Sequence, residues 1–364
     1  MEKEAKAKLI SLGIIILIVS ILIGIVIYKS LTNTEKNPHI NDIKMYEDLS
    51  DPYVYESTVV FEKWDSIKKA NHILVRDLST NEEVLIANDT HAAFPTIYRN
   101  YVVWGDFRNE DSDIYCYDLQ EKKEFVICKE DEYQGKPFIY KDLIIWQDYR
   151  DLRGMDHPHY FSDIYAYNLS TGEEYLLLRQ EYQISICSFE NNIITFISSD
   201  YDFPPEVISG DQWIYSGLLA NENTSLYQYN LDTNELNKLS YGNDVRTANS
   251  RNGNIAWVEK SSDSFQLYFK NSQSITSKSI YTNHWPINSL SITDEYVFLC
   301  QNYNPFESDI WRYDIEDKQV EEFYHEKYYD LYTIAYCKDR IFAEYSLREE
   351  NMVIKEDGVL EIKF

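Results

Sequence analysis

The sequence predicts an all-β protein, a seven-bladed β-propeller of four-stranded antiparallel blades, preceded by one N-terminal transmembrane helix. Three observations predict this fold class: a motif that recurs every 41 to 61 residues, four short strand-like runs in each repeat, and an uncharged run of 20 residues near the N-terminus. The composition agrees, because 32 Tyr, 16 Phe and only 11 Gly among 364 residues favour strands and a folded core over disorder.

Residues 9–28 (LISLGIIILIVSILIGIVIY) contain no charged side chain. At about 1.5 Å per residue a helix of this length covers the roughly 30 Å hydrocarbon core of a bilayer. A secretory signal peptide is the alternative, but its apolar stretch is shorter and ends at a small-residue cleavage site, whereas this run continues into Tyr28 and Lys29. We therefore expect an uncleaved signal anchor, with residues 29–50 as a linker.

Basic residues precede the apolar run at Lys3, Lys6 and Lys8, and only Lys29 and Lys36 follow it closely. The positive-inside rule then places residues 1–8 in the cytoplasm. The expected location is the cell membrane, crossed once, with the rest of the chain facing outward into the cell envelope.

The chain is strongly acidic, with 34 Lys and Arg against 61 Asp and Glu and a net charge of -27. A protein of this charge without a basic cluster is repelled by phosphate backbones. Nucleic acid is therefore excluded as an expected partner.

The cysteines are five in number, which is odd, and they show neither C-x-x-C spacing nor a paired Cys/His pattern. Each lies in or beside an apolar run, as buried thiols do. We expect free, inert thiols, with one internal bridge as the open alternative. They are Cys116, Cys128, Cys187, Cys300 and Cys337.

Two adjacent repeats are the clearest. The first begins YVVWGDFR at Tyr101 and continues to SDIYCYDL, and the second begins LIIWQDYR at Leu143 and continues to SDIYAYNL. Both share W-x-D-x-R followed by S-D-I-Y-x-Y-[DN]-L. Short links such as NLSTGEE, with Gly or Asn near the tip, fit tight hairpins between strands.

One aromatic side chain near the end of the second strand marks each repeat, and we expect it to fill the space between blades. Six repeats are marked in this way, at Phe61, Trp104, Trp146, Phe196, Trp257 and Phe298, and Ala343 takes the same position in a seventh repeat. We expect the last repeat, which ends at Phe364, to hold four strands of its own. Residues 42–46 are the alternative source of an outer strand there.

This pattern, an apolar run ending in Trp, an acidic loop and D-I-Y-x-Y-D-L, resembles the TolB-like (WD40-like) β-propeller repeats across residues 51–364. The resemblance implies a scaffold of exported or cell-envelope proteins that often binds other proteins, without a shared active site. Related propellers occur fused to α/β-hydrolase domains, but this chain has no G-x-S-x-G motif.

The loops between the second and third strands differ most among the repeats, and we expect insertions there in the third and fourth repeats. Insertions of this kind often mark the binding face of a repeat protein. The first begins at Asp151 and the second covers residues 200–223. The alternative is that both loops fold back over their own apolar residues. The predicted ligand-binding residues are His157, His159, Tyr160, Phe161, Tyr201, Phe203, Trp213 and Tyr215.

No cofactor and no metal is expected. Asp156 with His157 and His159 lacks a distant third ligand, and the oxygen-rich run 109–113 lacks the glycine of an EF-hand loop. Both remain less favoured alternatives.

The Asp and Arg of the W-x-D-x-R motif occur in two repeats, at Asp106 and Arg108 and again at Asp148 and Arg150. A catalytic group would occur once. We interpret them as structural, with Asp113 and Asp163 as their expected partners.

The sequence thus predicts a non-enzymatic binding platform for a protein or glycan partner at the cell surface. The alternative is an envelope carbohydrate-active enzyme, a lyase or hydrolase, with carboxylates from several blades gathered at the propeller mouth. An assembly or sensory subunit is a third reading.

Overall fold

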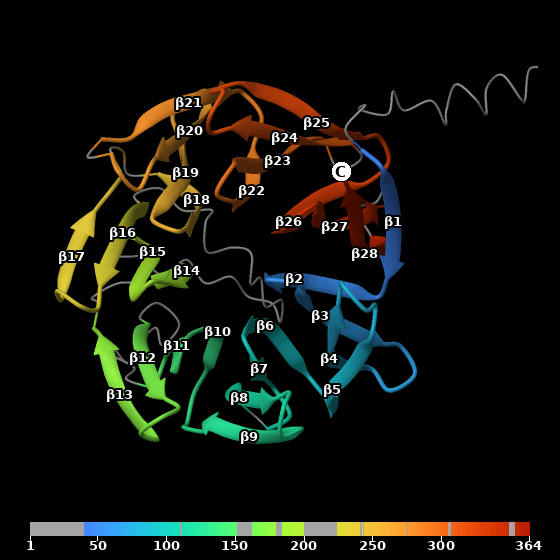
Figure 1. The fold of residues 1–364 in the computed structure, drawn as a ribbon, viewed down its shortest axis with the longest axis vertical. Helices are drawn as coiled ribbons and strands as arrows, with labels where there is room; N and C mark the ends of the chain where they lie inside the picture. The colour runs from blue at the N-terminus through green and yellow to red at the C-terminus, as the bar shows by residue number, and fades with distance from the viewer. Residues whose placement is uncertain are drawn as a thin grey trace, which may run out of the picture. The chain divides into compact units, whose positions relative to one another are not determined.

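The computed structural model describes residues 40–364 apart from positions 110, 151–161, 180–183, 200–223, 241, 243, 275, 305–306 and 349–353, and without the side chains of 88–90, 199 and 355. Its strands form seven four-stranded antiparallel sheets arranged as blades around one axis (Figure 1). The predicted seven-bladed propeller is confirmed.

Each blade is numbered in chain order, with its strands given from the axis to the rim. Blades 1 to 3 are β2 (Leu49–Tyr55), β3 (Thr58–Asp65), β4 (Ala70–Asp77), β5 (Glu83–Thr90); β6 (Ala92–Tyr98), β7 (Tyr101–Asp106), β8 (Asp113–Asp118), β9 (Lys123–Cys128); β10 (Gln134–Tyr140), β11 (Leu143–Asp148), β12 (Asp163–Asn168), β13 (Glu173–Leu178). Blades 4 to 6 are β14 (Ile184–Glu190), β15 (Ile193–Ser199), β16 (Thr224–Asn230), β17 (Glu235–Lys238); β18 (Val245–Arg251), β19 (Asn254–Lys260), β20 (Phe265–Lys270), β21 (Lys278–Asn283); β22 (Ile287–Ile292), β23 (Tyr296–Asn304), β24 (Glu307–Asp314), β25 (Val320–Glu326).

Blade 7 closes the ring with strands from both ends of the propeller. It contains β26 (Asp330–Cys337), β27 (Arg340–Arg348), β28 (Ile354–Lys363) and, at the rim, β1 (Asp42–Glu47). The expectation that the last repeat supplies four strands of its own was wrong, and the alternative of an outer strand from residues 42–46 is confirmed. The propeller begins at Asp42, inside the segment predicted as linker, because a rim strand is identified only by its distant partner β28.

The core lies between blades. Trp104 of blade 2 is fully buried against Val60 and Ile73 of blade 1, and Trp146 of blade 3 packs against Ile114 of blade 2 in the same way. The aromatic markers therefore fill the joints between blades, as predicted.

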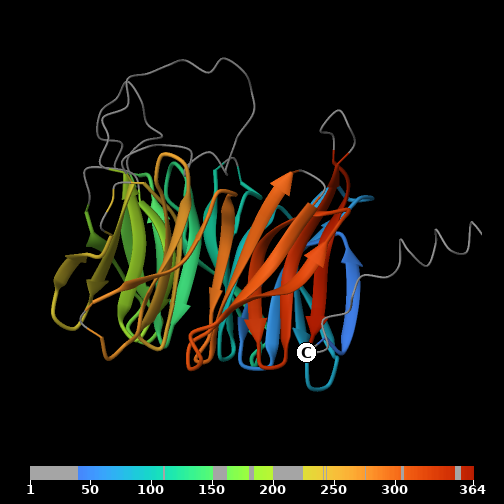
Figure 2. The ribbon, with the colours of Figure 1, turned by 90° about the horizontal axis from the view of Figure 1, so that it is seen from above.

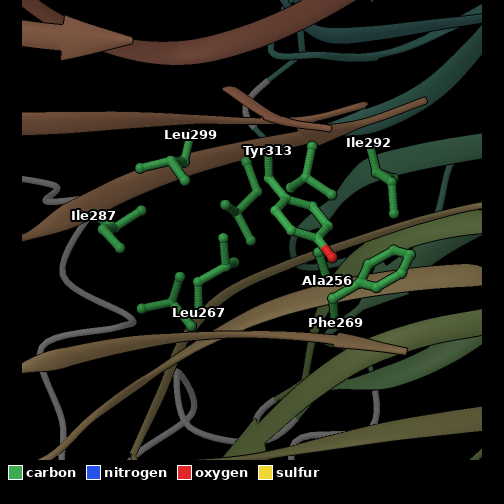
Figure 3. Close-up of a cluster of buried hydrophobic side chains, with 10 residues drawn as sticks. Ala256, Leu267, Phe269, Ile287, Ile292, Leu299 and Tyr313 are labelled. Atoms are coloured by element: carbon green, nitrogen blue, oxygen red, sulfur yellow. The ribbon is translucent and has the colours of Figure 1, made fainter. Parts of the chain in front are cut away.

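One marker is displaced by a residue. Leu299, not Phe298, pairs with the third strand at the position of Trp104, and it packs in the cluster between blades 5 and 6 (Figure 3). Phe298 points to the opposite side of its strand, where its ring lies 5.6 Å from that of Tyr336 in blade 7. Successive side chains of a strand face opposite ways, so a shift of one residue changes which joint is filled.

The five cysteines are free, as predicted, and all but Cys187 are buried. Within the described part of the chain, no helix has the length and apolar character needed to span a bilayer, and the predicted span at residues 9–28 lies outside it.

Candidate functional site

Both insertions connect the second and third strands of a blade. The first follows β11, and the second follows β15, whose last residue Ser199 is the register partner of Thr224 at the start of β16. Second strands run in the same direction in all blades, so these strand ends lie on one face of the ring, which we call the insertion face (Figure 2). The predicted binding residues lie outside the described residues: His157, His159, Tyr160, Phe161, Tyr201, Phe203, Trp213 and Tyr215.

The repeated Asp and Arg residues form a structural unit. Trp104 Nε1 donates to Asp106 at 2.9 Å, Arg108 pairs with the same carboxylate at 2.6 Å, and the guanidinium lies over the Tyr115 ring. Arg108 also pairs with Glu124 of the rim strand β9 at 2.6 Å. The structural interpretation is supported by an equivalent unit in blade 3.

The predicted partners of these arginines were wrong. Arg108 and Arg150 reach Glu124 and Glu174 of the rim strands, whereas Asp113 accepts a hydrogen bond from Asn109. Glu124 and Glu174 lie on the rim strand, two strands away from the strand that precedes each arginine. Local spacing does not reveal such a contact, so the sequence suggested Asp113 and Asp163, which are nearer in the chain.

A second group of residues lies near the axis. In every blade the pairing of the inner strand with the second strand is broken by a β-bulge. In blades 1 to 3 the bulge contains a residue with positive φ followed by proline, namely Asp51 (45°), Phe94 (55°) and Lys136 (48°). Proline lacks the N–H that strand pairing needs, and bulges often redirect side chains near functional sites.

Two buried glutamates join these bulges to the neighbouring blades. Glu344 of blade 7 accepts a hydrogen bond from the backbone N–H of Asp51 at 2.6 Å, and Glu62 of blade 1 accepts one from Phe94 N–H at 2.7 Å. Lys136 Nζ lies 5.8 Å from the centre of the Phe94 ring. We call Asp51, Glu62, Phe94, Lys136 and Glu344 the axial cluster.

The electrostatics of the axial cluster are unusual for an acidic protein. Burial, and then the charge of Asp51, raises the pKa of Glu344 to about 8 and raises that of Glu62 well above its ordinary value. Burial lowers the pKa of Lys136, and the nearby Asp51 opposes this effect. At neutral pH the two glutamates are therefore held mainly as neutral acids, which can both donate and accept hydrogen bonds.

Chemically, the axial cluster offers the two neutral acids, the side chain of Asp51, one amine and an aromatic ring, contributed by blades 7, 1, 2 and 3. Groups with displaced pKa values gather at functional sites more often than elsewhere. In the described ranges, no group of three or more His, Cys, Asp or Glu side chains is arranged to hold a metal ion. Asn109, Asp111 and Asp113 border an open depression of about 590 Å³, together with Arg108 and residues 129–131.

Sequence reasoning missed the axial cluster. Its one local signal is the recurrence of a proline in the first strand of three consecutive repeats, at Pro52, Pro95 and Pro137. The convergence itself depends on the ring, which brings residue 344 next to residue 51.

No protein-family model matches this sequence, and no curated protein matches it. Solved structures are similar in fold. The β-propeller domain of the Trilobed protease from Pyrococcus furiosus is 13% identical over 88% of this chain and 94% of that one, with a TM-score of 0.59. A puromycin-hydrolyzing peptidase from Mycobacterium tuberculosis is 9% identical over 87% of this chain and 52% of its own length, with a TM-score of 0.60.

TolB from Acinetobacter baumannii is also similar, at 11% identity over 72% of this chain and 62% of that one, with a TM-score of 0.49. The two structures with TM-scores of 0.59 and 0.60 show a shared fold, and identities this low show nothing about ligands. This chain spans about half the length of the peptidase.

Proposed function

We propose that this protein is a membrane-anchored, extracytoplasmic propeller that captures a protein partner on its insertion face. The observation that carries the proposal is the position of the axial cluster. It lies in blades 7 and 1 to 3, and the bulges at Asp51, Phe94 and Lys136 are near the starts of the inner strands β2, β6 and β10. The inner strands are antiparallel to the second strands, so these starts lie on the insertion face, where β11 and β15 end.

Backbone strain supports a binding role for that end of the ring. Asp51, Phe94 and Lys136 adopt a positive backbone angle φ, which residues other than glycine rarely do. Strain of this kind persists where the surrounding structure enforces it, and it is often found at ligand sites. Here it presents an acid, an aromatic ring and an amine from three consecutive blades.

The exposed aromatic side chains of the insertion face support a protein partner rather than a small cofactor. Exposed aromatic side chains described on the insertion face include Trp64 and Trp285, which are 42% and 47% exposed, and the insertions add the aromatic residues predicted from the sequence. Trp and Tyr are enriched at contact hot spots of protein interfaces.

The proposal is tested by shortening one insertion. Because Ser199 and Thr224 are register partners, residues 201–222 can be replaced by a short Gly-Asn turn without moving either strand. We expect cross-linking on intact cells to lose its partner adduct while the melting temperature stays unchanged. The matched control is Asp317→Lys on the opposite face, which should retain the adduct. An unchanged adduct in the shortened protein contradicts the proposal.

A second candidate function is favoured by one observation, the raised pKa values of Glu62 and Glu344 beside Asp51. A carboxyl group that is protonated near neutral pH can act as a general acid in cleaving a glycosidic bond. This is the carbohydrate-active alternative, with carboxylates from several blades.

Chromogenic glycosides and polysaccharides provide its test. Turnover that disappears in Glu62→Gln and Glu344→Gln, while the folded protein remains stable, supports an enzyme. If the parent protein turns over none of these substrates, the result contradicts the enzyme alternative and favours the binding function.

A further inference from the structure

Blade 6 departs from the repeated Trp-Asp-Arg unit at the same place in the fold. The register places Leu299 where blade 2 has Trp104, and Gln301 where it has Asp106. Tyr303 follows Gln301 at the spacing at which Arg108 follows Asp106. Blade 6 therefore lacks the buried carboxylate that accepts the indole N–H elsewhere.

Its polar side chains form two networks instead. In the first, Gln301 Oε1 accepts hydrogen bonds from the Tyr281 hydroxyl at 3.1 Å and from Asn283 Nδ2 at 2.8 Å, both from rim strand β21 of blade 5. In the second, the buried carboxylate of Asp309 accepts from the Tyr303 hydroxyl and pairs with His325 Nδ1 at 2.6 Å.

Two buried donors in this corner, on Gln301 and Trp311, have no hydrogen-bond partner among the described residues. Gln301 is fully buried, and its Nε2 has no hydrogen-bond partner among the described residues. Trp311 Nε1 is buried as well and has no hydrogen bond of normal geometry. Burial raises the pKa of the Tyr303 hydroxyl, and this nitrogen is close enough to oppose that effect. A buried donor without an acceptor costs about 1–3 kcal/mol, which an oxygen atom from a ligand would offset.

Two side chains of this corner, Trp285 and His325, are partly exposed to solvent. Trp285 lies in the connection that leads into blade 6 and is 47% exposed, and its ring meets that of Tyr303 edge to face at 5.7 Å. His325 Nε2 is 3.8 Å from Glu307, too far for a hydrogen bond, and the histidine side chain is 28% exposed.

We propose that this corner, lined by Trp285, Gln301, Tyr303, Asp309 and His325, is a binding subsite for a neutral saccharide. A pyranose has an apolar C–H face that can pack on Trp285, and hydroxyl groups that both donate and accept. Those groups match the carboxylates of Glu307 and Asp309 and the donors of His325 and Gln301. The acidic side chains disfavour an anionic ligand.

The subsite is separate from the axial cluster and goes beyond protein capture. Its residues lie at the joint of blades 5 and 6, where Gln301 and Tyr303 occupy the positions that Asp106 and Arg108 have in the unit that stabilises blade 2.

The test uses the full chain in a detergent without a sugar headgroup. Maltotriose, cellotriose, chitotriose and mannotriose serve as neutral probes, and trigalacturonic acid serves as the anionic probe. Binding is followed by ligand-observed NMR and by tryptophan fluorescence. We expect at least one neutral probe to bind and the anionic probe not to bind.

Two variants locate the binding. Trp285→Ala should weaken it about tenfold by removing the stacking surface, and Gln301→Leu should weaken it without removing an exposed group. Trp64→Ala, which removes another exposed tryptophan of the insertion face, should leave it unchanged. Failure of all neutral probes to bind the folded protein, or equal loss in Trp64→Ala, overturns the assignment.

Discussion

Glu344 Oε1 lies 2.6 Å from the backbone nitrogen of Asp51, so the last blade is joined to the first by a buried carboxyl group. The first strand of the propeller, β1, precedes blade 1 in the chain but pairs with β28 as the rim strand of blade 7. Closure of the ring therefore depends on a strand at the rim and on an acid near the axis. Both features lead to measurable expectations.

Stability should fall as the pH rises through the neutral range. The folded state holds Glu344 with a pKa of about 8, against an ordinary value of 4.5, so the unfolded state releases this proton first. The contribution is complete below about pH 4.5 and is lost towards about pH 8, at no more than about 1.4 kcal/mol per pH unit for one group. Glu344→Gln, which keeps an acceptor for Asp51, should flatten the profile measured by urea unfolding.

The matched control for this titration is Glu121→Gln in an exposed turn, which should reproduce the parent profile. If Glu344→Gln and the parent show the same slope between pH 5 and pH 8, the buried acid is not the source of the dependence.

Removal of the closing strand should destabilise the propeller. Tyr46 donates to Glu361 at 2.8 Å and its ring lies under the Arg76 guanidinium at 4.2 Å, in addition to the β1–β28 ladder. A chain that begins at Leu49 should lose roughly 3–6 kcal/mol of unfolding free energy relative to one that begins at Ile40, at about 1 kcal/mol per hydrogen bond.

Tyr46→Phe in the longer chain is the control, since it removes one hydrogen bond and should cost about 1 kcal/mol. Equal denaturant midpoints for the two chain lengths would show that three strands suffice in blade 7.

The carboxylate of Asp106 should be one of the most sensitive positions in the scaffold. It is fully buried and binds both the Trp104 indole and the Arg108 guanidinium. Asp106→Ala leaves these donors without their acceptor and should cost about 3–5 kcal/mol in chemical denaturation. Asp111→Ala, at an exposed position of the same loop, should change stability by less than about 0.5 kcal/mol.

The thiols should be unreactive in the folded protein. Burial raises the pKa of Cys187 to about 12 and raises the pKa of Cys116 and Cys128 strongly, so little thiolate is present at neutral pH. Ellman's reagent should modify them slowly in buffer and titrate five thiols in concentrated guanidinium chloride. Rapid reaction of Cys116, Cys128, Cys300 or Cys337 in the folded protein would contradict their burial.

The repeat was readable because each blade uses the same local pattern, and the markers Trp104 and Trp146 lie where the pattern predicts. The position of the marker was harder to predict in the repeats that match the pattern less closely. Phe298 and Leu299 are both apolar and adjacent, and only the pairing of Leu299 with Trp311 shows which of them faces blade 5.

The sequence also placed the insertions correctly between second and third strands, at 148–163 and 199–224. It missed the axial cluster and the corner of blade 6, because their members are distant in the chain. Nothing in the local sequence distinguishes Gln301; only the strand register shows that it takes the position of Asp106 in the repeated unit.

The sequence by itself determined the number of blades, the strands of most blades and the free cysteines, since strand periodicity and turn residues act over a few positions. The tertiary structure alone decided how the ring closes, which carboxylates meet the arginines and which side chains converge at the axis. Those outcomes depend on strands and neighbouring blades that come together only when the ring forms, bringing residue 51 against residue 344, and no local pattern encodes such contacts.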